Sequence, residues 1–354
     1  GGSVLGSLAR LKKEWGFAML KFIVKRLLLG VVVMLGVITI TFLLVHVLPS
    51  NPAAKWVGAR ATPEQIAQAE IELGLDKPLP VQYVNYIKDL LNLDMGRSLR
   101  THQPVTKELA NYLPATLELV LCATILAVLI GLPMGILSAK NKDKLGDHLS
   151  RFISIGAVSL PTFWMGIFMQ LIFYSWLYVL PVGGQLSQNI KIFYEIPHVT
   201  GFLIFDSIIT GNWTIAADAL RHIILPCITI ALYPIGLVAR MTRSAMLEIL
   251  NEDYITAVRS YGISERRVHW RYALKNSLGA TATVVTLSIG STLVNTFLVE
   301  AIFDWPGIGS YISNAVTTLD YPAVMGVTLF SALSYVILNL ISDIIIALDP
   351  RIRV

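Results

Sequence analysis

Residues 115–138 have the sequence ATLELVLCATILAVLIGLPMGILS, which contains a single charged side chain, Glu118. A helix needs about 20 predominantly apolar residues to cross the roughly 30 Å of hydrocarbon in a bilayer. The hydrophobic residues are continuous and do not alternate with a period of two, which favours a helix over a strand of a closed barrel. The stretch therefore predicts a transmembrane helix.

Comparable apolar runs recur along the 354 residues, at 22–48, 152–180, 222–242, 280–302 and 323–348. With 55% hydrophobic and only 14% charged residues, the chain has too few charges to cover a surface that faces water. The sequence predicts an all-α membrane protein with six transmembrane helices. The first helix, 19–48, is expected to include an elbow, and residues 1–18 before it are interpreted as an N-terminal appendage.

Basic residues are distributed unevenly among the predicted loops. Most of the 28 Lys and Arg residues lie in 1–26, 138–151, 240–279 and 349–354. These segments alternate with the spans, and an excess of basic residues marks the cytoplasmic side. We therefore expect both termini in the cytoplasm, with 349–354 as a cytoplasmic tail. This alternation with the spans argues against a basic patch that binds nucleic acid.

Residues 49–114, between the first two spans, are expected to form a small extracytoplasmic helical domain. A capping-box pattern at 62–65 predicts the start of one helix, and Gly74 predicts its end. Two more helices are expected at 81–93 and 104–112. Residues 115–348 would then form the transmembrane core.

The longest predicted cytoplasmic loop, 243–279, has the pattern of two short helices around a glycine. The first helix, 252–261, begins with acidic residues, which the helix dipole favours there. Tyr254, Val258 and Tyr261 follow the spacing i, i+4, i+7 and predict one apolar face.

Gly262 is expected to adopt the left-handed conformation that ends a helix, and Ser264 with Glu265 to begin the next one. This second helix is basic over 266–275. Such a unit suits docking into a groove on another protein. A basic amphipathic element can equally lie on anionic membrane lipid, and the residue pattern leaves both interpretations open.

From Leu247 to Leu278 the loop resembles the EAA loop of permeases in the dipeptide and oligopeptide ABC importer family, a loop that contacts the ATPase subunit. The resemblance implies an ATPase-coupling role for Glu252, Asp253, Tyr254, Ala257, Gly262, Ser264, Glu265 and Arg266. The loop departs from the general importer pattern at Thr256, Val258 and Lys275.

The similarity to this family continues outside the loop. Ordered matches occur at 96–98, 111–116, 160–161, 240–244, 300–309 and 349–353. The resemblance implies a type I ABC importer permease fold in a prokaryotic cell membrane. It also implies a complex with a second homologous permease subunit as a heterodimer, two ABC ATPase subunits and an extracytoplasmic substrate-binding protein.

The expected function is to form half of the translocation pathway for peptides, with oligosaccharides and nickel chelates as alternative cargo in the family. The sequence has no Gly-x-x-x-x-Gly-Lys-Ser/Thr phosphate loop, so ATP and Mg are expected on the partner ATPases and none in this chain. We therefore expect a non-catalytic subunit without a cofactor or metal site. An ion-coupled secondary transporter and a membrane-embedded scaffold remain alternatives.

Five residues are candidates for lining a pathway: Pro161, Ser291, Thr292, Asn295 and Glu300. Pro161 can kink the third span, either to line a pathway or to adjust packing. The three polar residues on the fifth span can face a pore or form hydrogen bonds between helices. Glu300 lies at a predicted membrane end, where it would face either the pathway or water.

Overall fold

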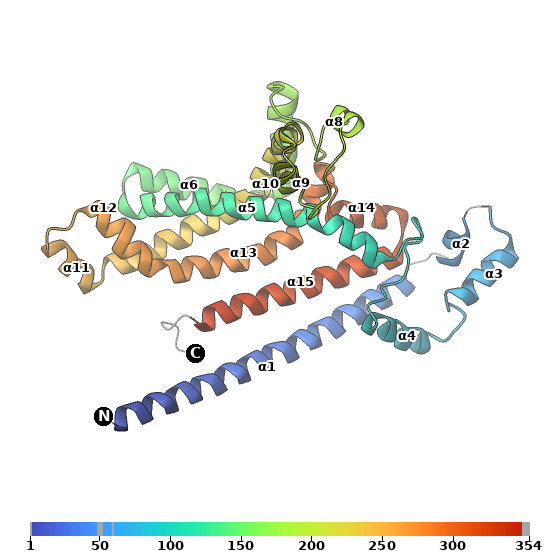
Figure 1. Cartoon of the computed structure of the whole chain (residues 1–354), viewed down its shortest axis with the longest axis horizontal. Coiled ribbons are helices and arrows are strands. Elements are labelled where there is room, and N and C mark those ends of the chain that lie inside the picture. The colour runs from blue at the N-terminus through green and yellow to red at the C-terminus, as the bar shows by residue number, and fades with distance from the viewer. Residues whose placement is uncertain (1, 48–51, 59, 349–354) are drawn as a thin grey trace.

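Five long helices run side by side along the molecule (Figure 1). The computed structural model describes residues 2–47, 52–58 and 60–348, and it has no strands there, only one isolated bridge. Each long helix contains a segment long and apolar enough to cross a membrane. They are α1 (Gly2–Val47), α5 (Val105–Lys140), α10 (Trp213–Leu250), α13 (Leu274–Ile302) and α15 (Tyr321–Leu348). The all-α membrane fold is therefore confirmed.

The predicted third span is not a single helix. The structure has α6 (Leu145–Ser159), then α7 (Thr162–Gln170) with its π-helical continuation η1 (Leu171–Trp176), and the two parts are bent by 102°. Pro161 has no N–H to donate, and it favours extended backbone at Leu160, which has φ −83° and ψ 134°. The expected span at 152–180 is thus corrected to a bent helix pair, which makes a sixth span if the pair is counted as one.

Short helices occupy the two ends of the long bundle (Figure 1). At one end lie α2 (Pro52–Val57), α3 (Pro63–Glu72) and α4 (Leu79–Leu91). At the other end, where α1 begins and α15 ends, lie α11 (Asp253–Ser260), α12 (Glu265–Arg267) and the π-helical η2 (Val268–Ala273). Segments predicted on opposite sides of the membrane therefore lie at opposite ends of the molecule. The predicted tail, 349–354, is outside the described residues.

Helix α3, between α1 and α5, begins as its sequence predicts. The Thr62 hydroxyl accepts from the Gln65 N–H at 3.3 Å, and the Gln65 side chain accepts from the Thr62 N–H at 2.9 Å. Gly74 follows this helix with a φ of +66°. The separate helix expected at 104–112 is wrong, because these residues form the start of α5.

The remaining helices, α8 (Gln188–Phe193), α9 (Leu203–Ile209) and α14 (Ile308–Thr318), are short and lie between the long ones in sequence. Their loops are held by carboxylates. Asp206 accepts from the N–H groups of Val199 and Gly201, both at 2.9 Å. Burial alone would raise the pKa of Asp206, but these hydrogen bonds and those from Thr200 lower it below its ordinary value.

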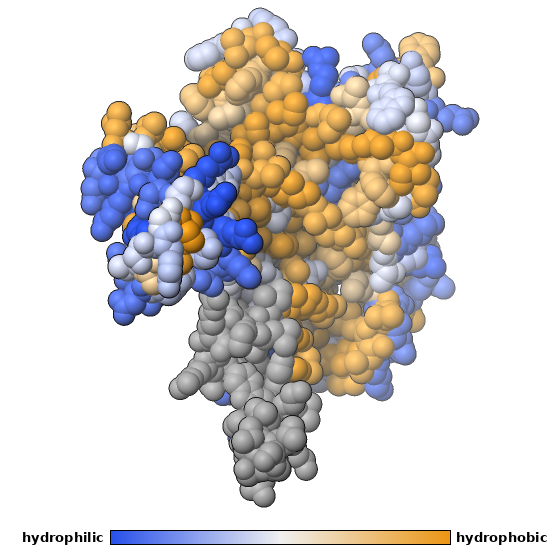
Figure 2. Space-filling model, turned by 60° about the vertical axis from the view of Figure 1, so that its left-hand side comes forward, coloured by the Kyte–Doolittle hydropathy of each residue, from blue (hydrophilic) through white to orange (hydrophobic). Residues whose placement is uncertain are grey.

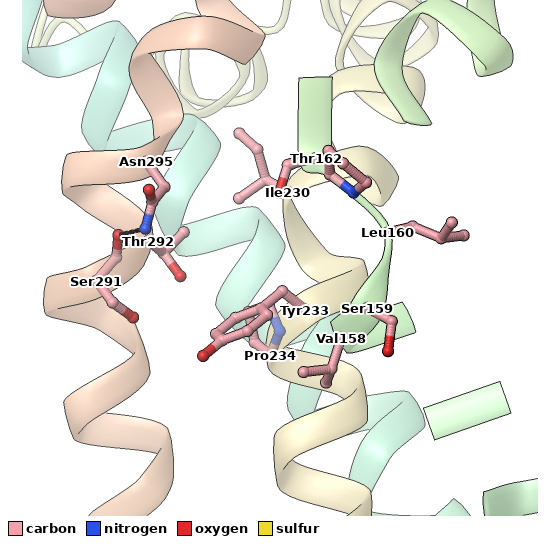
Figure 3. Close-up of a pocket in the computed structure, with 11 residues that line it drawn as sticks. Val158, Ser159, Leu160, Thr162, Ile230, Tyr233, Pro234, Ser291, Thr292 and Asn295 are labelled. Atoms are coloured by element: carbon pink, nitrogen blue, oxygen red, sulfur yellow. Dashed lines mark hydrogen bonds between the residues drawn. The ribbon is translucent and has the colours of Figure 1, made fainter. Parts of the chain in front are cut away.

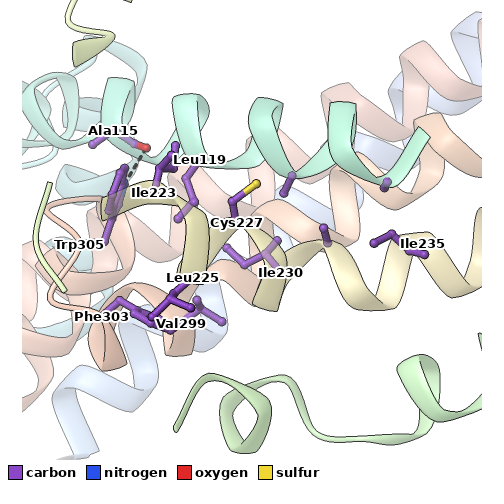
Figure 4. Packing of buried hydrophobic residues seen from close by; sticks show 13 residues of the cluster. Ala115, Leu119, Ile223, Leu225, Cys227, Ile230, Ile235, Val299, Phe303 and Trp305 are labelled. Carbon is purple, nitrogen blue, oxygen red and sulfur yellow. Dashed lines mark hydrogen bonds between the residues drawn. The ribbon is translucent and has the colours of Figure 1, made fainter. Parts of the chain in front are cut away.

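The central packing contact is between α5 and α10 (Figure 4). Leu119 on α5 and Ile230 on α10 belong to one buried hydrophobic cluster. Farther along, Gly131 and Gly135 face α10 so closely that a Cβ on Gly135 would lie 2.6 Å from the Ala239 carbonyl oxygen. Two small residues four apart are a known way for membrane helices to bring their backbones together.

The outer surface suits lipid. The membrane-length window of α10 is 72% buried inside the molecule, whereas that of α1 is only 17% buried. Leu28 and Val32 on α1 are among its exposed hydrophobic side chains. In the space-filling view, a broad hydrophobic surface separates hydrophilic patches (Figure 2). Helix α10 is thus the centre of the bundle, and α1 is a peripheral helix.

Replacing Gly135 by Ala is expected to destabilise the chain, because the added methyl group forces α5 away from α10. Overpacking of this kind costs about 1–3 kcal/mol, and we expect a lower melting temperature in detergent. The matched control is Gly156→Ala on α6, where an added Cβ meets no atom within 4 Å. Equal melting temperatures for the two variants would contradict the close approach of α5 and α10.

Candidate functional site

A cavity of about 350 Å³ lies between the bend of α6 and α7, the middle of α10, and α13 (Figure 3). Residues 158–162 contribute one wall, Ile230, Tyr233 and Pro234 another, and α13 the third. The hydroxyl of Tyr233 points toward α13 in Figure 3. Tyr233 and Pro234 are close to the midpoint of α10, so the cavity lies near the middle of that helix.

Two prolines interrupt backbone hydrogen bonding at the cavity. Pro161 separates α6 from α7. Pro234 lies inside α10 and has no N–H to donate to the carbonyl of Ile230, four residues earlier. Both Pro234 and Ile230 line the cavity, so polar backbone groups lie in its walls. Irregular backbone at membrane depth is tolerated where it lines a cavity.

The α13 wall of the cavity carries three polar side chains, Ser291, Thr292 and Asn295. Asn295 uses its amide nitrogen to donate to the Ser291 carbonyl at 2.8 Å, and Ser291 donates to the Ser288 carbonyl at 3.0 Å. Thr292 is only 6% exposed, and its hydroxyl has no hydrogen-bond partner among the described residues. In Figure 3 this hydroxyl points into the space between α13 and α10.

Four of the five candidate pathway residues therefore come together. Pro161, Ser291, Thr292 and Asn295 line this one cavity, although Pro161 is far from the others in sequence. Sequence reasoning missed Tyr233. It could have been found as an aromatic residue with a hydroxyl group that directly precedes a proline in an apolar span.

Glu300 does not line the cavity. It is fully buried, so the expectation that it faces water is wrong. One carboxylate oxygen accepts from the Gly309 N–H at 2.6 Å, and the loop between them also docks on α5 through the Trp305 indole N–H, 2.9 Å from the Ala115 carbonyl. Glu300 thus holds the turn between α13 and α14.

The second candidate region is the helix–glycine–helix unit at the end of the bundle. Gly262 has a φ of +74°, so its predicted left-handed conformation is confirmed. Across this turn, Arg259 donates to Glu265 at 2.8 Å. Ser264 occupies the N-cap position of α12, but its side chain makes no capping hydrogen bond there.

One side of this unit is anchored and the other is exposed. Ile255, Val268 and Ala273 are completely buried. The predicted apolar face contains Tyr261, which is 85% exposed and covered by no described residue. The residues predicted to contact a partner are all exposed: Glu252, Asp253, Tyr254, Ala257, Gly262, Ser264, Glu265 and Arg266. The surface left open therefore carries aromatic side chains together with charged side chains of both signs.

The two regions are joined by one helical run. The second helix of the loop does not end before α13, because α12, η2 and α13 continue from Glu265 to Ile302. Arg266 lies at one end of this run, and Thr292 lies about 40 Å away at 1.5 Å per residue. One continuous helical run therefore connects the exposed unit to one wall of the cavity.

The buried Asp147 connects the turn between α5 and α6 to α10. Both of its carboxylate oxygens accept from the Arg243 guanidinium at 2.7 Å, and Ser138 donates to it at 2.6 Å. Bidentate arginine–carboxylate pairs fix geometry strongly. Helices α5, α6 and α10 therefore form one rigid group at this end. The described residues hold no group of three or more His, Cys, Asp or Glu that could bind a metal.

A cysteine at position 295 is expected to react with a charged, membrane-impermeant thiol reagent, since Asn295 is exposed in the cavity. The measurement uses membranes opened to both sides, with Cys122 and Cys227 replaced by serine. Thr296→Cys is the control, because Thr296 is one residue farther along α13 and only 1% exposed. Equal labelling of both positions would contradict the placement of the cavity.

Comparison with known proteins gives a consistent result over nearly the whole chain. Residues 131–354 match the family described as "Binding-protein-dependent transport system inner membrane component", and residues 19–120 match its N-terminal family. The chain is 42% identical to the probable D,D-dipeptide transport system permease protein DdpB of Escherichia coli, over 91% of this chain and 94% of that protein. It is 41% identical to the dipeptide transport system permease protein DppB of Alkalihalophilus pseudofirmus, over 95% of this chain and 100% of that protein.

Proposed function

We infer the function from the family to which this chain belongs, the binding-protein-dependent transport system inner membrane components. The chain is a multi-pass membrane permease related to subunits of dipeptide ABC transport systems. We propose that it is the transmembrane subunit of an ATP-driven importer and forms half of the translocation pathway for short peptides. The observation that carries this proposal is the unbroken helical run from the exposed unit at Glu265 to the cavity wall at Asn295.

The cavity is proposed to be part of the pathway. It lies beside a broken helix near the middle of α10, and transporters commonly bind their substrates at midplane sites built from discontinuous helices. The second half of the pathway would come from a homologous permease subunit, giving a heterodimer. Peptides are favoured over oligosaccharides or nickel chelates because the relatives are named for dipeptide transport.

The exposed unit at α11 and α12 is proposed to dock into a groove on an ABC ATPase subunit. Its open face combines Tyr261 with Arg266 and Arg267, and exposed aromatic and arginine side chains are characteristic of interface hot spots. Two such ATPases would bind ATP and Mg and supply the energy. The permease itself would remain non-catalytic.

The orientation of the chain in the membrane follows from the proposed docking of the ATPases. ATPases that use cellular ATP must lie in the cytoplasm, so α11, α12 and the start of α1 would be cytoplasmic. Helices α2–α4 would then face outward, where an extracytoplasmic substrate-binding protein would deliver the peptide. Their attachment to the bundle is firm, because Ser98, between α4 and α5, donates to Asp320 at 2.5 Å and Lys55 donates to the Thr318 carbonyl at 3.1 Å.

ATP-driven closure of the ATPases would move the docked unit and, through the run from Glu265 to Ile302, shift α13 against α10. The cavity lies between these two helices, so its shape would follow the nucleotide state. Such coupling requires that the helical run have two alternative positions, and that both the docked unit and the cavity affect which of them it adopts.

Replacing Gly262 by Leu is expected to reduce association of the ATPases or to uncouple ATP hydrolysis from uptake, while the chain still inserts in the membrane. A side chain here disfavours the φ of +74° and alters the turn that presents the docking face. The readouts are co-purification of the ATPases and peptide uptake per ATP hydrolysed. We expect at least a several-fold loss.

The matched control for this variant is Gly211→Leu. Gly211 also has a φ of +74° with no atom within 4 Å of an added Cβ, but it lies between α9 and α10, away from the exposed unit. It imposes the same local strain without touching the proposed docking face. Normal coupling in Gly262→Leu, or equal loss in both variants, would overturn the assignment of the loop.

A further inference from the structure

We propose that the cavity between α6–α7, α10 and α13 binds the peptide group of the solute through neutral hydrogen-bonding groups, so that this subunit recognises the amide backbone and not the solute's charges. The proposal rests on the function proposed above and specifies what the pathway recognises at this point. It assigns contact roles to Tyr233, Thr292, Asn295 and the Ile230 carbonyl.

The cavity wall carries no charge. None of the residues that line it is Asp, Glu, Lys, Arg or His. A carboxylate or ammonium group moved out of water without a charged partner is strongly disfavoured. The charged termini of a peptide would therefore have to keep contact with water while its amide binds, whereas an uncharged amide suffers a much smaller desolvation penalty when hydrogen bonds replace its water.

The hydroxyls of Thr292 and Tyr233 can donate into the cavity from facing walls. The neighbouring Thr296 donates to the Thr292 carbonyl at 2.6 Å, the ordinary arrangement for Thr in a helix, but the Thr292 hydroxyl has no such partner among the described residues. Thr292 is only 6% exposed, and it lines the cavity, so its hydroxyl is available to a ligand there. The Tyr233 hydroxyl, on the facing wall, also has no partner in the described chain, and both point into the gap in Figure 3.

Acceptors line the same space. Pro234 has no N–H, so the Ile230 carbonyl lacks the helical hydrogen bond that residue 234 would otherwise donate. The Asn295 amide nitrogen donates to the Ser291 carbonyl, and its side-chain oxygen remains available to accept a hydrogen bond. A peptide group carries one N–H and one C=O, so the donors and acceptors of this cavity match the two halves of the amide.

The dimensions are suitable. The cavity of about 350 Å³ falls within the range of roughly 300–1,000 Å³ that is usual for small-molecule sites. Recognition of the amide alone would let peptides with different side chains pass the same walls. Selection among peptides would then depend on other parts of the complex.

The test uses the complete transporter with its ATPases and binding protein in proteoliposomes, and it measures ATP-dependent uptake of labelled Ala-Ala, Ala-Lys and Ala-Glu. Thr292→Val and Tyr233→Phe each remove one hydroxyl with little change in shape. We expect each to reduce uptake about 10-fold and by the same factor for all three peptides. Thr292→Ser, which keeps the hydroxyl, is expected to retain uptake, and Thr296→Val, outside the cavity, serves as the matched control.

The outcomes separate the two proposals. Absence of ATP-dependent peptide uptake in the unmodified complex would overturn the proposed function. Uptake by the unmodified complex with no loss in Thr292→Val and Tyr233→Phe, or with a loss that depends on the charge of the peptide side chain, would overturn recognition of the amide. Loss in Thr292→Ser equal to that in Thr292→Val would likewise show that the hydroxyl is not the contact.

Discussion

The close approach of α5 to α10 at Gly131 and Gly135 is the contact on which the rest of the molecule depends. In lipid, apolar side chains gain little by leaving one hydrocarbon environment for another, so membrane helices associate largely through tight packing and polar contacts. The two glycines supply that packing and make α10 the buried centre of the bundle. Helices α6, α7 and α13 then pack around α10, and the cavity forms where their surfaces fail to meet.

Buried carboxylates fix the ends of this bundle. Asp147 pairs with Arg243 at the end that carries α11 and α12, whereas Glu300 and Asp320 hold loops at the opposite end. Asp147 and Asp320 each accept several hydrogen bonds, as buried charges usually do. Glu300 accepts one from the Gly309 N–H, and its other carboxylate oxygen has no partner among the described residues. The cavity in the middle of the bundle is different, because the side-chain hydroxyls of Thr292 and Tyr233 have no hydrogen-bond partner in the described chain. This contrast distinguishes groups that hold the structure from groups left available to a solute.

Much of this architecture could be predicted from the sequence because hydrophobic length and helix punctuation are local signals. The spans, the capping box at 62–65 and the left-handed Gly262 were all predicted from neighbouring residues. The sequence indicated that Pro161 can kink the third span, but not by how much, since the 102° angle depends on how α7 packs against α10 and α13. Candidate pathway residues were grouped by polarity, which identified Ser291, Thr292 and Asn295 but missed Tyr233, whose polar tip is remote from its backbone.

Glu300 shows the limit of sequence reasoning most clearly. A carboxylate near a membrane end can line a pathway, face water or hold a loop, and its neighbours in sequence do not distinguish these roles. Its acceptance of the Gly309 N–H depends on how α14 folds back, which is a property of the tertiary structure. For the exposed face of α11 the sequence pattern is clear, but the role of this face depends on a partner outside this chain.

The chain is proposed to transport peptides by using ATP that is hydrolysed on partner subunits. The most direct measurement is peptide uptake by the reconstituted complex with ATP and no ion gradient, and separately with an ion gradient and no ATP. We expect uptake in the first condition, insensitive to ionophores, and none in the second. Uptake driven by an ion gradient without ATP would contradict it and identify a secondary transporter instead.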